Sequence, residues 1–173
     1  TLRDTTHYRR VGDTLNYLGS AVSPDDSALA IRGLQTLHVR LKQVGESALR
    51  VATWLQSHRA VEAVLHPAFP SCPGHEIWKR DFTGSSGLFS VVFRPPITRA
   101  DLLAAMDRMR LFRMGYSWGG VASLVMAPGP DAPNTRRYGG RLLRLYVGLE
   151  DPDDLIADLE QALRFAQSTT GSR

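Results

Sequence analysis

The chain has 173 residues, 43% of them hydrophobic and 22% charged, a balance that suits one globular domain with a buried core and argues against disorder. Its formal net charge of +4 comes from 19 arginines and two lysines that form no basic run, which argues against nucleic-acid binding. No apolar run approaches the ~20 residues of a membrane helix, and the single cysteine, Cys72, excludes an internal disulfide and fits a reducing cytoplasm.

The first third of the chain is predicted to be helical. Residues 4–18 look like one helix, and Ser23-Pro24-Asp25-Asp26 supplies an N-cap, a proline and two acids for a second. That second helix should be long, because an apolar stripe continues at three- and four-residue spacing through Leu34, Leu37, Leu41, Val44, Ala48, Val51 and Leu55. Gly33 and Gly45 interrupt it at a cost of ~1 kcal/mol each. The stripe packs either on the chain's own sheet or on another domain or subunit.

Strands and helices alternate irregularly in the remainder. The expected order is a strand at 61–67, a short helix at 75–79, a strand at 88–96, a helix at 98–110, extended segments at 111–120 and 123–130, a strand at 141–151, and a helix from Asp151. Because this is not a regular βαβ alternation, we predict an α+β domain whose mostly antiparallel sheet of about four strands is covered by helices on one side.

The strand at 141–151 carries an unusual charge. Leu143, Leu145 and Val147 share one face of it, whereas Arg144 lies on the other, between Leu142 and Tyr146. A guanidinium pairs with a carboxylate through two parallel hydrogen bonds, which a lysine cannot do. Arg144 therefore indicates either a solvated sheet surface or a site for a carboxylate.

A second candidate segment is Gly115-Tyr116-Ser117-Trp118-Gly119-Gly120. Its glycines would let the backbone approach a ligand, while Ser117 and Trp118 offer a hydroxyl and an aromatic wall. The alternative is a tight turn with a packed tryptophan.

Other chemical motifs are weak. His58, His66 and His75 match no metal-ligand spacing, so we predict no metal site. Cys72 and His75 could suggest a nucleophile and its base, but no third group that would orient them is identifiable.

Several separated segments together resemble a known family. These are SPDDSALAIRGLQTL, VLHPAFPSCPGHEIWKRDFTGSSGLFS, GYSWGGVASL and LLRLYVGLEDPDDLIADLEQAL. They resemble the C-terminal part of the pyridoxal-phosphate (PLP)-dependent enzymes of cysteine and methionine metabolism, and within them the bacterial cystathionine β-lyases. The resemblance covers nearly the whole chain from about residue 13.

The resemblance implies the small C-terminal domain of a fold-type-I PLP enzyme. Residues 1–57 would form N-terminal helices that include the long interdomain helix, and residues 58–173 would form the small domain. The partners implied are a large PLP-binding domain that these residues do not include, an amino-acid substrate and further copies in a homodimer or homotetramer, but neither nucleic acid nor membrane.

The resemblance also assigns site residues. Arg144 matches the arginine that binds the substrate α-carboxylate, and Tyr116, Ser117 and Trp118 match the segment lining the same pocket. The cofactor's lysine lies in a Ser-x-Thr-Lys-type motif in this family, and neither Lys42 nor Lys79 has that context. No catalytic or cofactor-binding residue is therefore assigned, and these 173 residues alone are expected to be inactive.

The function implied is carbon–sulfur cleavage of cystathionine, by β-elimination, to homocysteine, pyruvate and ammonia, with these residues supplying the carboxylate site. Two alternatives stay open. One is a related PLP enzyme acting on another thioether amino acid, and the other is a non-enzymatic basic binding module.

Overall fold

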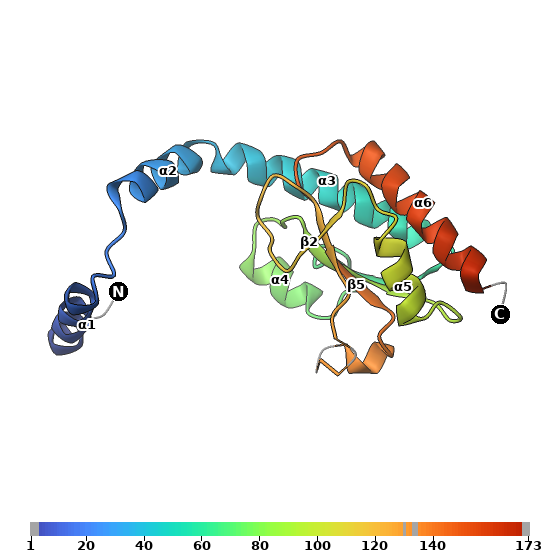
Figure 1. Cartoon of the computed structure of the whole chain (residues 1–173), viewed down its shortest axis with the longest axis horizontal. Coiled ribbons are helices and arrows are strands. Elements are labelled where there is room, and N and C mark those ends of the chain that lie inside the picture. The colour runs from blue at the N-terminus through green and yellow to red at the C-terminus, as the bar shows by residue number, and fades with distance from the viewer. Residues whose placement is uncertain (1–3, 130, 133–134, 171–173) are drawn as a thin grey trace. The chain divides into compact units, whose positions relative to one another are not determined.

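A computed structural model describes residues 4–129, 131–132 and 135–170. The chain divides into two compact units, 1–38 and 39–173. The boundary predicted between residues 57 and 58 stays a prediction. The chain runs α1 (Thr5–Leu18), α2 (Pro24–Gln35), α3 (Leu37–Ser57), β1 (Val61–Leu65), α4 (His75–Asp81), β2 (Leu88–Phe93), α5 (Arg99–Met106), β3 (Arg113–Met114), β4 (Leu124–Met126), a 3₁₀ turn (Arg136–Tyr138), β5 (Leu142–Tyr146) and α6 (Pro152–Thr170) (Figure 1).

Capping residues begin three of the helices, and Ser23 of α2 is the cap predicted above. Asp4 accepts the amides of Thr6 and His7 at the start of α1, and Ser23 accepts the amide of Asp26 at the start of α2. Thr98 and Asp101 form a capping box at the start of α5.

The prediction of a single long helix from residue 24 is wrong. It is divided at Thr36, whose φ of −114° and ψ of 5° leave helical geometry, so α2 ends at Gln35 and α3 begins at Leu37. The predicted apolar stripe is divided too. Val44, Ala48, Val51 and Leu55 are buried in the core, whereas Leu34, Leu37 and Leu41 are exposed. Only the second half of the stripe therefore packs on the chain's own sheet.

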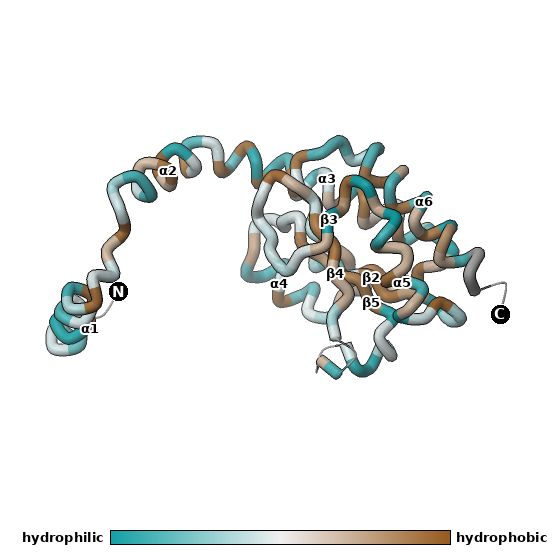
Figure 2. Tube along the Cα trace, in the orientation of Figure 1, coloured by the Kyte–Doolittle hydropathy of each residue, from teal (hydrophilic) through white to brown (hydrophobic). Residues whose placement is uncertain are grey.

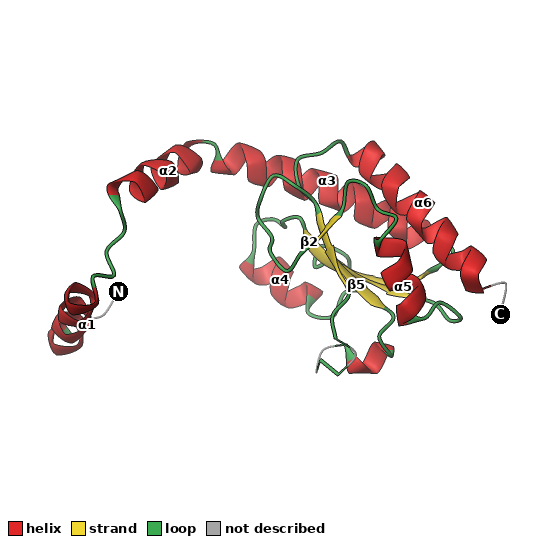
Figure 3. Cartoon of the chain, viewed as in Figure 1, coloured by secondary structure: helices red, strands yellow, loops and turns green. Residues whose placement is uncertain are grey.

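The sheet has five strands in the order β1-β2-β5-β4-β3, one more than expected. Every pair is antiparallel except β3 with β4, so the predicted mostly antiparallel α+β class is confirmed (Figure 3). The extended segments are shorter than predicted, since only two residues of 111–120 and three of 123–130 are strand, and Pro130 lies outside the described residues. β5 ends at Tyr146, and Leu149 is largely outside the core.

The core lies between one face of the sheet and the helices α3, α5 and α6. It contains Val91 of β2, Leu143 and Leu145 of β5, and apolar residues of all three helices, so the central strands are brown in Figure 2. α3 and α6 lie side by side, since Arg50 pairs with Asp153 and His58 Nε2 lies 3.3 Å from a Glu160 oxygen. The aliphatic face predicted for Arg141–Asp151 is confirmed for Leu143, Leu145 and Val147.

One buried carboxylate fastens α6 to the turn before β3. Asp158 accepts the backbone N–H groups of Arg110 and Leu111 at 2.8 Å and of Phe112 at 3.2 Å. These amides belong to no helix or strand ladder, so the carboxylate supplies the acceptor that burial requires. The chain leading into β3 is thereby held against α6.

Candidate functional site

Arg144 lies at the centre of the sheet. β5 is the third of five strands, and Arg144 is in register with Ser90 of β2 and Met126 of β4. Its side chain leaves the sheet on the face opposite Leu143 and Leu145, where it is half-buried. Arg144 is thus part of a strand that is hydrogen-bonded to a neighbouring strand on each side.

Three backbone carbonyls orient the guanidinium. The Nη2 group of Arg144 donates to the carbonyl oxygens of Gly115 at 3.3 Å, Tyr116 at 2.6 Å and Ser117 at 3.2 Å. Its Nε atom is buried and has no hydrogen-bond partner among the described residues. Within that part of the chain no carboxylate is paired with Arg144, so its positive charge is held in place but not neutralised.

The segment predicted to share the site does lie beside Arg144. Tyr116 and Ser117 meet it through their carbonyl oxygens, whereas their side chains are exposed, Tyr116 by 80%. Trp118 follows directly and is 63% exposed. Gly119 has a φ of +86°, a conformation that side-chain-bearing residues rarely adopt, so this glycine is needed for the turn itself, and its close approach to a ligand stays a prediction. The structure therefore brings together the four residues assigned from the sequence, Tyr116, Ser117, Trp118 and Arg144, which we call the Arg144 cluster.

Tyr146 is a member of this cluster that the sequence did not assign. It lies two residues beyond Arg144 on the same face of β5, is buried, and donates its hydroxyl to the Gly120 carbonyl at 2.8 Å. Burial raises the pKa of this phenol. Tyr146 was visible in the sequence as a neighbour of Arg144, but its acceptor is a backbone atom, which no sequence pattern marks.

After Gly119 and Gly120, the chain is bound by Glu150 at Ser123. Its two carboxylate oxygens accept the backbone N–H and the hydroxyl of buried Ser123, each at 2.8 Å. The Ser123 hydroxyl oxygen in turn accepts the Gly148 N–H at 2.8 Å. Gly148 allows this close approach, since a Cβ there would lie 2.3 Å from the Val121 carbonyl oxygen.

The other candidate groups lie elsewhere. His66 is fully buried between the rings of Phe69 and Phe89, and the Cys72 thiol, whose pKa is raised by burial, contacts the carbonyl of Pro73. His75 bonds the Pro67 carbonyl oxygen and not the Cys72 sulfur. Across the described ranges no group of three metal-ligating side chains gathers, and no helix there is long and apolar enough to cross a bilayer.

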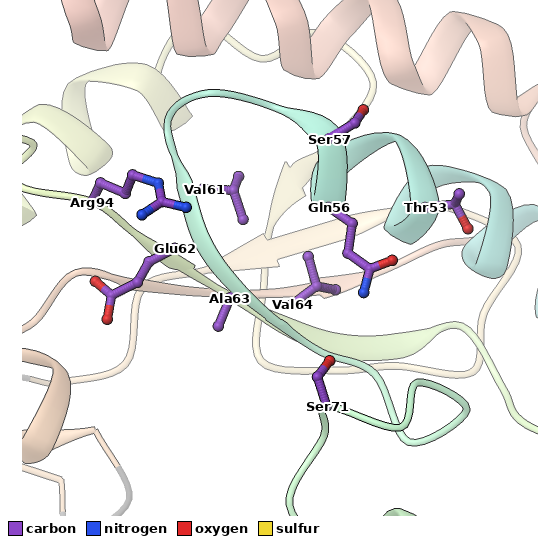
Figure 4. A pocket seen from close by; sticks show the side chains of 9 residues that line it. All are labelled: Thr53, Gln56, Ser57, Val61, Glu62, Ala63, Val64, Ser71 and Arg94. Atoms are coloured by element: carbon purple, nitrogen blue, oxygen red, sulfur yellow. The ribbon is translucent and has the colours of Figure 1, made fainter.

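A separate pocket of about 500 Å³ lies where the end of α3 faces β1 (Figure 4). It is lined by Thr53, Gln56, Ser57, Val61, Glu62, Ala63, Val64, Ser71 and Arg94. None of these residues belongs to the Arg144 cluster. The pocket is therefore a different feature of the molecule.

The sequence profile of one family, described as "Cys/Met metabolism PLP-dependent enzyme", matches residues 3–164. The chain belongs to this family. It is 49% identical over 149 residues to cystathionine beta-lyase MetC of Escherichia coli (strain K12), covering 83% of this chain and 38% of that protein. It is 48% identical over 148 residues to cystathionine beta-lyase of Salmonella typhimurium, covering 82% and 38%.

A solved structure agrees with this assignment. The cystathionine gamma synthase of Xanthomonas oryzae pv. oryzae, in complex with aminoacrylate and cysteine, superposes with a TM-score of 0.82 at 31% identity, covering 98% of this chain and 45% of that one. The chain thus has the fold of part of a PLP enzyme, as its sequence motifs implied. It spans well under half the length of the curated relatives that it matches.

The structure of an O-acetylhomoserine (thiol)-lyase from Campylobacter jejuni, 31% identical to this chain with a TM-score of 0.80, carries a pyridoxyl-lysine monophosphate. The two lysines of this chain do not fit such a role beside Arg144. Lys42 is 77% exposed on α3 and lies 3.9 Å from Glu46, while Lys79 is exposed on α4. Neither is part of the Arg144 cluster. Among the described residues, neither lysine is therefore placed to attach a cofactor beside Arg144.

Proposed function

We propose that these residues form the carboxylate-binding side of a PLP-dependent carbon–sulfur lyase that cleaves cystathionine by β-elimination. The observation that carries this proposal is the unpaired guanidinium of Arg144, fixed at mid-sheet by three carbonyl oxygens. Neutral carbonyls orient a cation without cancelling its charge, so an incoming α-carboxylate meets a positioned donor. The identity to bacterial cystathionine beta-lyases supports the choice of reaction.

Each group of the cluster has a place in this function. Arg144 would hold the carboxylate, which fixes the direction of the bonds at the substrate Cα. Trp118 and Tyr116, both exposed beside Arg144, would form a wall along the substrate side chain. The cofactor, bound by a separate large domain, would supply the electron sink that elimination requires.

The substrate could instead be another thioether amino acid, because the carboxylate site is common to all of them. Membership of the family favours either enzyme over a non-enzymatic binding module. A homodimeric or homotetrameric assembly stays part of the proposal, as does a cytoplasmic location.

The test replaces Arg144 with lysine in a full-length enzyme that carries these residues. Lysine keeps the positive charge but cannot make paired hydrogen bonds to a carboxylate. Since a charge-assisted hydrogen bond contributes roughly 1.5–3 kcal/mol, kcat/KM for cystathionine should fall about ten- to a hundred-fold.

Arg94→Lys is the matched control, because Arg94 is exposed after β2 and outside the cluster. Steady-state kinetics of the two variants, with circular dichroism to check folding, separate the site from general effects of arginine loss. An Arg144→Lys enzyme with the kcat/KM of the Arg94→Lys enzyme would remove the basis of the proposal.

A further inference from the structure

Arg144 and residues that follow it bind the backbone of the site segment at several points. Arg144 holds the carbonyls of 115–117, Tyr146 holds that of Gly120, and the Leu149 N–H donates to that of Val121 at 2.9 Å. Glu150 then holds Ser123. The stretch from Arg144 to Glu150 therefore binds the segment from Gly115 to Ser123 at several successive points.

Trp118 lies between two of these hydrogen-bonded residues. The Arg144 contact with Ser117 directly precedes it, and the Tyr146 contact with Gly120 follows two residues later. Two glycines separate Trp118 from Val121, and Gly119 is at positive φ, so the backbone there has little stiffness of its own. Without the Tyr146 hydroxyl, the chain from Trp118 to Gly120 would be held only at its ends.

We infer that Tyr146 is a positioning residue that sets the direction of Trp118 by binding the Gly120 carbonyl, and that it thereby tunes which substrate side chain fits beside Arg144. This inference rests on the proposed function for its second part only. The first part concerns the segment itself and can be tested without any activity.

The phenol suits the role because its ring is fixed independently of its hydroxyl. The ring is buried, and it packs against Gly87, where a Cβ would lie 2.9 Å from the Tyr146 Cε2 atom. Tyr146→Phe should therefore keep the ring in place and remove only the hydrogen bond. Since a neutral hydrogen bond changes an equilibrium by about five-fold, the anchored arrangement of the segment should lose about that factor in population.

The experiment labels the 173-residue chain with 5-fluorotryptophan and records its ¹⁹F NMR spectrum. The chain contains three tryptophans, so Trp54 and Trp78 serve as internal controls for Trp118, whose resonance is assigned with Trp118→Phe. In Tyr146→Phe the Trp118 resonance should shift and change width while the other two stay in place. Tyr138→Phe, which removes a hydroxyl elsewhere, should alter none of them.

Two results would overturn the positioning role: a Trp118 resonance identical to that of the parent chain, or equal movement of all three resonances, which would mean a general structural disturbance. The full-length enzyme then tests the second part. Tyr146→Phe should raise KM for cystathionine about three- to ten-fold with a smaller change in kcat, because a loosened wall weakens substrate binding. A displaced Trp118 resonance with unchanged kinetics would retain the positioning role and refute the assignment of this segment to the substrate pocket.

Discussion

At the scale of single residues, the structure holds a buried imidazole whose second nitrogen has no partner. His66 Nδ1 accepts the Ala68 N–H at 3.2 Å, so its proton resides on Nε2, which is buried without an acceptor among the described residues. Burial lowers the pKa of His66, since the charged form would lose its hydration. Protonation would also turn Nδ1 from an acceptor into a donor facing the Ala68 N–H.

This arrangement predicts a loss of stability in mild acid. Above the unfolded-state pKa of ~6.5, His66 is neutral in both states and contributes no pH dependence. Below it the unfolded chain binds the proton more readily, so the free energy of unfolding should fall by up to ~1.4 kcal/mol per pH unit. Urea unfolding between pH 5 and pH 8 measures this slope.

The His66→Asn variant keeps an acceptor for Ala68 but cannot titrate, so its slope should be smaller by up to that amount. His58, whose pKa is also lowered, mainly by burial, accounts for part of the slope that remains. The same substitution at exposed His38 is the control. An unchanged slope in His66→Asn would show that His66 does not supply the pH dependence.

At the scale of elements, two helical glycines that look alike in the sequence have opposite roles. Gly45 of α3 faces the loop before β2, and a Cβ there would lie 2.7 Å from the Ser85 carbonyl oxygen. Gly12 of α1 has open space where its Cβ would be. Gly45 is therefore required by a backbone approach, whereas Gly12 only weakens its helix.

Alanine substitution at the two positions should have effects of opposite sign. Gly45→Ala should destabilise the chain by about 1–3 kcal/mol, because a backbone atom must move to admit the methyl group. Gly12→Ala should raise the stability of α1 by up to ~1 kcal/mol through helix propensity. Chemical unfolding measures the first change and the helical circular dichroism signal the second. A stabilised Gly45→Ala chain would mean that the loop at Ser85 yields freely.

The sequence predicted those features that depend on neighbours along the chain. The Ser23 cap of α2 and the aliphatic face of β5 are of this kind, and so is the location of Arg144. The sequence analysis missed the break at Thr36, because neither a proline nor a glycine stands at that position to mark it. It also treated Gly45 as a defect, because Ser85, which Gly45 faces, is remote in sequence. Tyr146 was missed for the same reason, since a contact with a backbone carbonyl leaves no residue-type signature.

At the scale of the whole molecule, the described residues supply only one side of the proposed site. Arg144, which we propose to bind the carboxylate, lies with its supporting segment, while both lysines lie exposed on helices outside that cluster. A PLP enzyme needs the carboxylate site and the cofactor lysine in one pocket. The proposed lyase activity should therefore require a second protein domain that brings the cofactor lysine close to Arg144.

We accordingly expect the 173 residues alone not to bind PLP productively. After incubation with PLP and borohydride reduction, mass spectrometry should find only scattered modification of Lys42, Lys79 and the amino terminus, and no cystathionine cleavage should be detected. The full-length enzyme, treated identically, is the positive control. A stoichiometric adduct at one of the two lysines together with turnover would contradict this expectation.

The Asp158 carboxylate has a consequence for how the protein is made. It supplies acceptors to residues 110–112, which a ribosome releases well before residue 158. Until α6 emerges, those three amides lack the Asp158 acceptor, and the turn that leads into β3 is not fixed against α6. A nascent chain cut short before Asp158 would thus display an open, protease-sensitive segment, and quality control could recognise it as incomplete.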